Sequence, residues 1–376
     1  MKGIHLLLVL SLIFLVNVQP AKGETRPEAW VNGAKELYLT PDDNIEFQIG
    51  FEGEGAAECW VAIYSPFGWF SYGLREGEWW FGLKGSFAGE MKNFSPKTIL
   101  KITGLPKGDY FLFFVVDSLI NGEIDPDSLS YDLATLHIRE FFRPKPGTTW
   151  QWQLSGTLDL SVNAQVYDVD LFETPKETID ALHSKGRRVI CYLNAGAWEE
   201  WRPDAQEYPA SVLGRELEGW EGERWLDIRQ IELLHPILRE RMQLAAEKGC
   251  DAIEPDNIDG YVNDTGFNLT YQDQLMFNRW LSLLAHSMGL SIGLKNDLNQ
   301  VKDLLPYFDW ALNEECFQYN ECEKLLPFVE SGKAVFGVEY EGDAKEFCPK
   351  ANSMGFSWMK KHLELDSWRE ACWEME

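Results

Sequence analysis

Carboxylate and amide side chains repeatedly follow short apolar runs in the second half of this chain. Hydrolysis of a glycosidic bond needs two facing carboxyl groups. One protonates the leaving oxygen, and the other attacks the sugar or activates water. Rigid strands hold such a pair well. The carboxylates at or just beyond the ends of the predicted strands are Glu254, Asp256, Asp297, Glu314, Glu315 and Glu339. Their pattern predicts a site for glycosidic-bond hydrolysis.

The elements that must position these groups alternate between strand-like and helix-like segments from residue 150 onward. Such alternation is typical of a parallel sheet, and a closed barrel has its active site at the carboxyl ends of the strands. We predict the α/β fold class with a (β/α)8 TIM-type barrel. An open doubly wound sheet is the structural alternative, but no Gly-x-Gly-x-x-Gly or phosphate-loop pattern supports it. The candidate strands are 150–154, 166–170, 188–194, 225–228, 251–254, 291–295, 309–313, 334–339 and 356–360. A barrel needs eight strands, so one of these nine candidates is either an additional strand or a segment that is not a strand of the barrel.

The N-terminus has the features of a secretory signal peptide. An apolar run from Leu6 to Val16 follows Lys2, and the small residues Ala21 and Gly23 form a cleavage pattern. The run is too short for a permanent membrane helix. We therefore expect a signal peptide over residues 1–23, cleavage near Gly23, and a secreted or periplasmic protein.

The remaining chain is long enough for two domains. Residues 24–142 contain short alternating runs between Gly, Pro and Asp turns, which predicts an all-β sandwich domain. A Pro-rich stretch within 143–149 predicts a linker. Residues 150–376 then form the predicted barrel domain.

The chain is strongly acidic, with a formal net charge of −26. Such a protein repels nucleic acid and anionic lipid at long range, so we expect no nucleic-acid partner and no membrane partner after signal cleavage. A cationic polymer would be attracted instead. The six histidines show no metal-binding spacing. We predict neither a metal nor a cofactor.

Secretion permits disulfides among the seven cysteines. Proximity favours Cys316 with Cys322, to brace the loop that carries Glu314. It also favours Cys348 with Cys372, to tie the C-terminal segment to the last barrel unit. Cys191 and Cys250 stand in or next to apolar runs and are interpreted as buried thiols.

Residues 148–372 resemble the barrel of glycoside hydrolase family 114, the endo-α-1,4-polygalactosaminidases. The matching segments are 150–154, 167–170, 189–196, 225–228, 254–259 (Glu-Pro-Asp-Asn-Ile-Asp) and 312–316 (Leu-Asn-Glu-Glu-Cys). The resemblance implies Asp256 as the nucleophile and Glu314 as the acid/base. Glu254 and Glu315, their close neighbours in sequence, are the alternative pair.

The resemblance also implies an endo-acting enzyme on de-N-acetylated galactosamine polymer, whose cationic charge fits an acidic protein. Tryptophans at strand ends could stack on sugar faces, and carboxylates could bind amines or hydroxyls. The candidate substrate-binding residues are Trp150, Trp152, Asp168, Asp170, Tyr192, Asn194, Asp227, Asn257, Asp259, Lys295, Asn296, Asp297 and Glu339.

Two other functions remain open. One is a glycosidase of another α-linked polysaccharide, because net charge cannot name a monosaccharide. The other is a non-catalytic carbohydrate-binding surface protein, which would be expected to lack a catalytic carboxylate. A serine hydrolase is disfavoured because Gly-x-Ser-x-Gly is absent.

Overall fold

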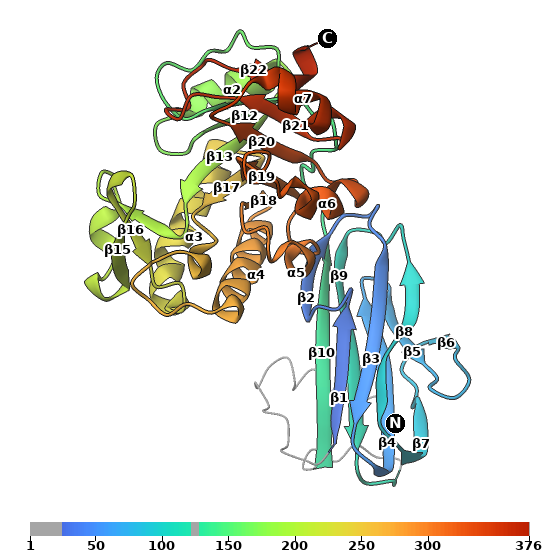
Figure 1. Cartoon of the computed structure of the whole chain (residues 1–376). Coiled ribbons are helices and arrows are strands. Elements are labelled where there is room, and N and C mark those ends of the chain that lie inside the picture. The colour runs from blue at the N-terminus through green and yellow to red at the C-terminus, as the bar shows by residue number, and fades with distance from the viewer. Residues whose placement is uncertain (1–24, 122–127, 376) are drawn as a thin grey trace. The chain divides into compact units, whose positions relative to one another are not determined.

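The computed structural model describes residues 25–121 and 128–375 (Figure 1). The predicted signal peptide lies outside the described residues. The chain divides into two compact units between Glu140 and Phe141. In the described part, no helix is long and apolar enough to cross a membrane.

The regular elements of the first unit are β-strands in two sheets, and residues 25–121 and 128–140 contain no α-helix. One sheet has the order β1-β3-β8; the other has the order β2-β10-β9-β4-β5-β6, with β7 paired to β4. The strands are β1 (Arg26–Val31), β2 (Glu36–Leu39), β3 (Ile45–Glu52), β4 (Gly55–Ser65), β5 (Gly68–Tyr72), β6 (Trp79–Phe81), β7 (Phe87–Met91), β8 (Phe94–Ile102), β9 (Gly108–Asp117) and β10 (Leu129–Ile138).

Alternate side chains of these strands form the core of the first unit. Phe51 on β3 and Phe94 on β8 each lie with their ring centroid 6.3 Å from that of Phe114 on β9. Ala29 N also donates to Asp132 Oδ2 at 2.6 Å. The two sheets therefore contact each other through apolar side chains, as the period-2 pattern requires.

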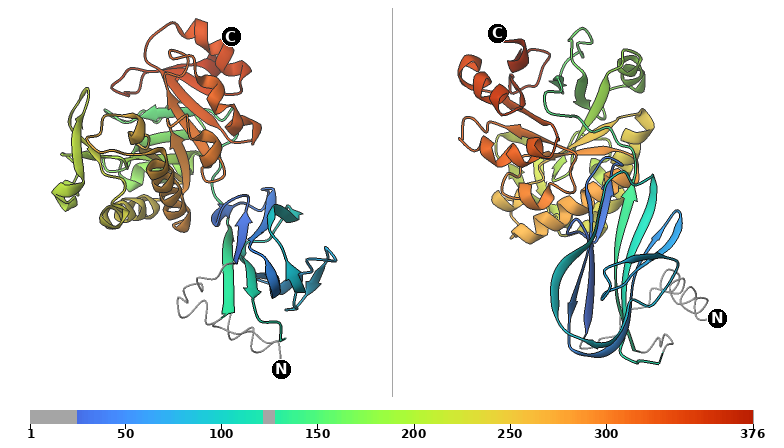
Figure 2. Two further views of the ribbon diagram at one scale, coloured as in Figure 1. Left: turned by 60° about the horizontal axis from the view of Figure 1, so that its bottom comes forward. Right: turned by 90° about the vertical axis from the view of Figure 1, so that its right-hand side faces the viewer.

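The second unit has a nine-stranded sheet in the order β11-β12-β13-β17-β18-β19-β20-β21-β22. Its strands are parallel except β22, which runs antiparallel to β21. The sheet curls on itself (Figures 1 and 2), in a mixed α/β fold of the TIM type. The strands are β11 (Trp150–Gln153), β12 (Val166–Asp170), β13 (Arg188–Asn194), β17 (Ala252–Asp256), β18 (Ser291–Lys295), β19 (Trp310–Glu314), β20 (Val335–Glu339), β21 (Ser357–Lys360) and β22 (Glu370–Ala371). The α-helices are α2 (Lys176–Ser184), α3 (Ile231–Lys248), α4 (Tyr271–Ser287), α5 (Val301–Leu304), α6 (Leu326–Glu330) and α7 (Ala344–Ser353).

The ninth predicted strand, 225–228, is not a strand of this sheet. Its first residues belong to β16 (Trp220–Leu226), which pairs antiparallel with β14 (Ala197–Glu199) and β15 (Leu213–Leu217). These three strands form a separate small sheet, called the insert here (residues 197–226). The insert projects from the body of the unit (Figures 1 and 2). It has its own small core of Ala197, Leu217 and Trp225, which is why the run looks like a buried strand.

A C-terminal segment joins the first and last parallel strands. Residues 361–371, called the C-terminal seam here, follow β21. Leu154 N donates to Leu365 O at 3.0 Å, and Arg369 Nη1 donates to Trp150 O at 2.5 Å. Trp150 Nε1 in turn donates to Ser357 O on β21 at 2.9 Å. The two ends of the curled sheet are thus held together by the seam and by one indole.

The core of the second unit lies within the curled sheet and is rich in aromatic rings. Trp150 stacks on Phe336 with centroids 4.8 Å apart, and both are fully buried. Glycine is required opposite another ring, because a Cβ at Gly337 would lie 2.1 Å from the indole of Trp358. A large side chain on one strand therefore packs against a glycine on the adjacent strand.

Three disulfides are present in the described residues. The predicted pairs Cys316–Cys322 and Cys348–Cys372 are both formed. The interpretation of Cys191 and Cys250 as thiols is wrong, because they form the third disulfide. Adjacent parallel strands bring them together, since Cys191 lies on β13 and Cys250 lies just before its neighbour β17. Cys59, in the first unit, is a buried free thiol.

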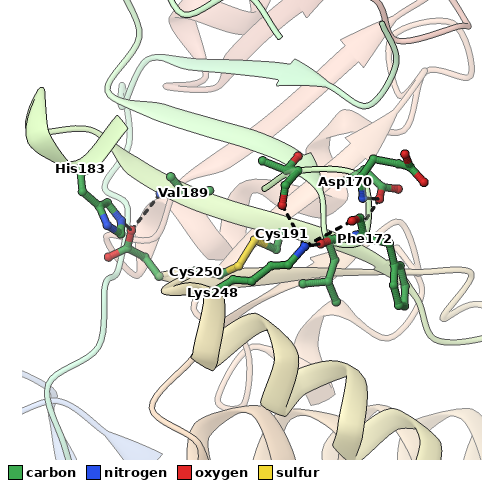
Figure 3. The surroundings of a disulfide bond; sticks show 11 residues. Asp170, Phe172, His183, Val189, Cys191, Lys248 and Cys250 are labelled. Carbon is green, nitrogen blue, oxygen red and sulfur yellow. Dashed lines mark hydrogen bonds and ion pairs between the residues drawn. A yellow bond between two sulfur atoms is a disulfide. The ribbon is translucent and has the colours of Figure 1, made fainter. Parts of the chain in front are cut away.

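The disulfide Cys191–Cys250 lies beside polar contacts of Lys248, at the end of α3 (Figure 3). Lys248 Nζ donates to Leu171 O at 2.6 Å and to Thr174 O at 2.9 Å, in the loop after β12. Burial lowers the pKa of Lys248. Its ammonium nevertheless ties the end of α3 to this loop.

Candidate active site

The carboxyl ends of the parallel strands open into a cavity of about 520 Å³. Its walls come from the ends of seven strands or the loops after them, from the insert and from the C-terminal seam. Ligand pockets usually measure roughly 300–1,000 Å³, and this end of a barrel carries the active site in enzymes of this fold.

Asp256 is the last residue of β17, and its carboxylate is held by three donors. Tyr192 OH donates to Oδ2 at 3.1 Å, while Oδ1 accepts from Asn257 N at 2.9 Å and lies 3.0 Å from Lys295 Nζ. The side chain keeps 22% of its surface exposed. These contacts orient the side chain and leave it accessible from the cavity.

Glu314 is the last residue of β19 and faces the same cavity. Asn296 Nδ2 donates to its Oε2 at 3.1 Å, and Tyr340 OH donates to its Oε1. The side chain is 25% exposed. Burial and the adjacent Glu314 raise the pKa of Tyr340 well above its usual range. The Tyr340 hydroxyl therefore keeps its proton and remains a hydrogen-bond donor to the Glu314 carboxyl group.

Lys295 lies between the two exposed carboxylates. Its Nζ is 3.0 Å from Asp256 Oδ1, 3.4 Å from Glu314 Oε2 and 2.7 Å from Glu254 Oε1. Burial works against the charge of Lys295, but these three carboxylates raise its pKa well above the usual value. Lys295 thus keeps its ammonium group charged at the buried side of the site.

Beneath Lys295 lies a buried layer that does not reach the cavity. Glu254 is fully buried, and its Oε2 accepts from Trp152 Nε1 at 3.0 Å. Burial raises the pKa of Glu254 to about 7, although Lys295 opposes the shift. Burial and the neighbouring Glu254 raise the pKa of Asp168 as well. Lys295 and Trp152 thus separate this layer from the exposed pair.

The backbone turns sharply where these strands end. Asn257, Asn296, Asp297 and Glu315 have φ values of 60°, 51°, 43° and 63°. Left-handed conformations in residues other than glycine cost about 1–3 kcal/mol each and cluster at functional sites. Here they follow β17, β18 and β19 directly. The last residues of these strands, Asp256, Lys295 and Glu314, all line the cavity.

Close backbone contact holds the loop after β17. Ala195 N and Gly196 N donate to Asp256 O at 3.1 and 3.0 Å. A Cβ at Gly196 would lie only 1.7 Å from Asn257 O. Only glycine therefore fits at this position, which fixes Asp256 against β13.

Further carboxylates line the cavity, Glu223 on the insert and Asp259 in the loop after β17. Burial, together with Glu199 and Asp256, raises the pKa of Glu223 to about 8. Burial followed by Asp256 raises the pKa of Asp259 to about 7. Arg202 is the nearby cation, but it already pairs with Asp170 at 2.7 Å and with Glu199 at 2.8 Å. The cavity thus presents more acidic groups than its own cations neutralise.

The structure brings many of the predicted site residues together and leaves others away from the cavity. The predicted residues that line it are Trp152, Asp170, Tyr192, Asp256, Asn257, Asp259, Lys295, Asn296 and Glu314. The predicted residues that do not line it are Trp150, Asp168, Asn194, Asp227, Glu254, Asp297, Glu315 and Glu339.

Those in the second group have other structural roles. Trp150 is a core residue, and Asp227 forms an ion pair with Arg229 at 2.7 Å. Glu339 accepts hydrogen bonds from Phe317 N at 3.0 Å and Trp358 Nε1 at 3.2 Å. Asn194 is buried and donates to Glu223 at 3.3 Å. These side chains support neighbouring elements and do not line the cavity.

Sequence reasoning missed several residues of the cavity wall: Leu154, Ser155, Glu173, Glu199, Trp201, Arg202, Leu217, Trp220, Glu223, Tyr340, Leu363, Glu364 and Leu365. Tyr340 carried a signal, because it directly follows the strand that ends at Glu339. Residues of the insert and the C-terminal seam lie outside the strand-end pattern, so that pattern could not identify them. Within the described residues, no group of three or more His, Cys, Asp or Glu side chains could hold a metal.

The glycoside-hydrolase family GH114 matches residues 135–375. A crystal structure of Aspergillus fumigatus Ega3 in complex with galactosamine is similar, with 40% sequence identity and a TM-score of 0.59. The match covers 61% of this chain and 97% of that one. The glycoside hydrolase domain of PelA from Pseudomonas aeruginosa matches at 11% identity and a TM-score of 0.49, over 59% of this chain and 97% of that one. No curated protein sequence matches the chain.

Proposed function

The chain belongs to glycoside hydrolase family GH114, and from this premise we propose that it is a secreted, endo-acting α-1,4-galactosaminidase of cationic, de-N-acetylated polysaccharide. One observation carries the proposal: two accessible carboxylates, Asp256 and Glu314, share one cavity with unneutralised acidic groups. The galactosamine bound in Ega3 supports the same class of sugar. Three disulfides are consistent with an oxidising compartment.

The acidity of the cavity fits an amino sugar. Glu223 and Asp259 both have pKa values raised by burial, which means that each lacks a cation sufficient to hold it ionised. Ammonium groups of a de-N-acetylated polymer supply such cations. The net charge of −26 would also concentrate a polycation around the protein.

We assign Asp256 as the nucleophile and Glu314 as the acid/base. Asp256 attacks the anomeric carbon while Glu314 gives a proton to the leaving oxygen, which breaks the glycosidic bond and forms a glycosyl ester. Glu314 then takes a proton from water, and the resulting attack releases the sugar and restores Asp256. The ammonium group of Lys295, 3.0 Å from Asp256 Oδ1, helps to orient the nucleophile.

The mechanism proposed here retains configuration, because Asp256 attacks the sugar directly. Asp256 Oδ1 and Glu314 Oε2 lie 3.0 and 3.4 Å from the same nitrogen, Lys295 Nζ, so one ammonium group contacts both carboxylates. The two carboxyl groups are roughly 5–5.5 Å apart in retaining enzymes and roughly 6.5–9.5 Å apart in inverting enzymes. Glu254, the alternative nucleophile, is fully buried and has both oxygens in contact with donors.

The proposal is tested by product analysis on de-N-acetylated polygalactosamine. We expect new reducing ends within the polymer and an α-anomer as the first product by NMR. Asp256→Asn and Glu314→Gln should each lower kcat by at least about 10³-fold, because each removes an essential chemical role. Glu254→Gln is the comparison variant for the alternative pair.

Cleavage only of a different α-linked polymer in a panel of polysaccharides would replace the substrate. Near-normal turnover in both the Asp256→Asn and the Glu314→Gln variants would reject the catalytic pair. A β-anomer as the first product would reject retention but leave the substrate intact.

A further inference from the structure

Two tryptophans of the insert are exposed on the wall of the cavity. Trp201 is 52% exposed and Trp220 is 49% exposed, and both line the cavity that holds the two carboxylates. Glu200 N donates to Gly222 O at 3.0 Å, so the chain at Trp201 runs beside the hairpin that carries Trp220. Large apolar side chains exposed within a cavity mark a surface for ligand contact.

The wall that carries these indoles is ordered by its own contacts. Ala197, Leu217 and Trp225 form its core, and Trp198 Nε1 donates to Ala205 O at 2.9 Å. The strands β14 and β15 both pair with β16. A rigid aromatic surface loses little conformational freedom when a ligand binds.

Glu223 lies on the same wall and has no cation of its own. It is buried and lines the cavity, and its side chain accepts from Asn194 Nδ2 at 3.3 Å. In the described part of the chain, no Lys, Arg or His forms an ion pair with it, and Arg202 is held by Asp170 and Glu199. A buried carboxylate in this state gains most from a cation brought by the ligand.

The strand register places Glu223 close to the proposed chemistry. Asn194, its hydrogen-bond donor, is the direct partner of Asp256 across β13 and β17. Asp256 also contributes to the raised pKa of Glu223. Glu223, on the wall that carries Trp201 and Trp220, therefore contacts the residue that pairs directly with Asp256.

We propose that Trp201, Trp220 and Glu223 form a hexosamine subsite beside the cleaved bond, where the indoles stack on sugar faces and Glu223 binds the ammonium group. This inference rests on the proposed function and extends it to selection of the free amine. Stacking also brings the positive charge close to aromatic rings, which attract it. An N-acetylated unit carries no charge and would leave the buried carboxylate without a partner, so this subsite discriminates against it.

The first test compares cleavage of de-N-acetylated polygalactosamine by the double variants Trp201→Ala/Trp220→Ala and Trp201→Tyr/Trp220→Tyr. We expect the alanine variant to lower kcat/KM by about ten-fold or more, and the tyrosine variant to restore most of it because an aromatic surface remains. Met276→Ala is the control, since Met276 is 60% exposed on α4 and does not line the cavity. Thermal unfolding verifies that each variant is folded.

The second test measures preference for the free amine. The ratio of kcat/KM on fully de-N-acetylated polymer to that on partly N-acetylated polymer should fall about ten-fold in Glu223→Gln, which preserves shape and removes the charge. An unchanged ratio, or an alanine double variant within two-fold of the wild type, overturns the subsite while the proposed function stands. If the wild type cleaves neither polymer, the proposed function is wrong and the subsite falls with it.

Discussion

A single lysine organises the charges at the centre of the cavity. Lys295 contacts one buried carboxylate, Glu254, and the two exposed ones, Asp256 and Glu314. One positive charge cannot neutralise three carboxylates. These four side chains together therefore retain negative charge unless a proton or a cationic substrate is added. This arrangement explains why burial raises the pKa of Glu254 even though an ammonium group lies 2.7 Å away.

Tyr340 should position Glu314 for proton transfer. Its hydroxyl donates to Glu314 Oε1, while Asn296 holds the other oxygen at 3.1 Å. We expect Tyr340→Phe to lower kcat by about ten- to a hundred-fold, because loss of a charge-assisted hydrogen bond costs roughly 1.5–3 kcal/mol. The bell-shaped pH profile of kcat should shift in the same variant.

Steady-state kinetics across pH provide the measurement. Tyr319→Phe is a matched control, because Tyr319 is 62% exposed and does not line the cavity. A Tyr340→Phe enzyme with unchanged kcat and an unchanged pH profile would contradict the positioning role.

Binding of a cationic sugar should release a proton from Glu223. Burial, Glu199 and Asp256 raise its pKa to about 8, while Arg202 opposes the shift. At pH 7, below that pKa, the carboxyl group is mostly protonated. An ammonium group favours the ionised form, so binding lowers the pKa and expels the proton; well above pH 8 no proton remains to be released.

Calorimetric titration with a galactosamine oligomer, in buffers of different ionisation enthalpy, measures this proton release. We expect up to about one proton at pH 7 from this group and a smaller number at pH 9. Glu223→Gln should lose this component. Equal proton release by the wild type and this variant would assign the proton to another group.

At the scale of elements, the disulfides brace the strands that end in the site. Cys191 precedes Tyr192, the donor to Asp256, and its partner Cys250 lies just before β17. Cys316 closes a short loop directly after Glu314 and Glu315. The two bonds differ mainly in the length of chain that they close.

Removal of these two disulfides should therefore have different effects. The separations are 59 residues for Cys191–Cys250 and 6 for Cys316–Cys322. In the loop-entropy model these correspond to roughly 4 and roughly 2 kcal/mol of unfolding free energy. We expect the Cys191→Ala/Cys250→Ala variant to show the larger loss of stability in denaturant titrations. The Cys316→Ala/Cys322→Ala variant should show the larger loss of kcat relative to its loss of stability. The reverse order in both measurements would show that loop closure does not dominate.

At the scale of the whole molecule, the candidate active site lies in one unit. Every side chain that lines the cavity belongs to the range 152–365, and the chain divides between Glu140 and Phe141. The first unit has its own apolar core between two sheets. The residues that line the cavity, the proposed catalytic pair among them, thus all belong to the second unit.

Residues 141–376 expressed alone should retain hydrolysis. We expect kcat within about two-fold of the full-length value on soluble oligomers, because a domain with its own core folds by itself. Reducing-end assays on the two proteins, with circular dichroism to verify folding, provide the comparison. A folded but inactive second unit would show that the first unit contributes to catalysis.

The sequence alone was enough to predict which segments form the parallel strands and which polar residues stand at their ends. Asp256, Lys295, Asn296 and Glu314 were accessible to this reasoning, because parallel strands place all their carboxyl ends at one face. The family followed from the same motifs. The pairs Cys316–Cys322 and Cys348–Cys372 were also predictable, since their partners are close along the chain or flank one structural unit.

Tertiary structure alone decided which of these groups meet, because pairing between distant segments depends on strand neighbours and on the curl of the sheet. Cys191 and Cys250 looked like separate buried thiols until β13 and β17 became neighbours. The run at Trp225 looked like a barrel strand because its burial comes from the core of the insert. Glu254 and Asp256 differ by two positions, yet only the second reaches the cavity, because β17 ends at Asp256 and Lys295 and Trp152 cover the first. An apolar pattern records that a segment is buried, but it does not record the partner that buries it.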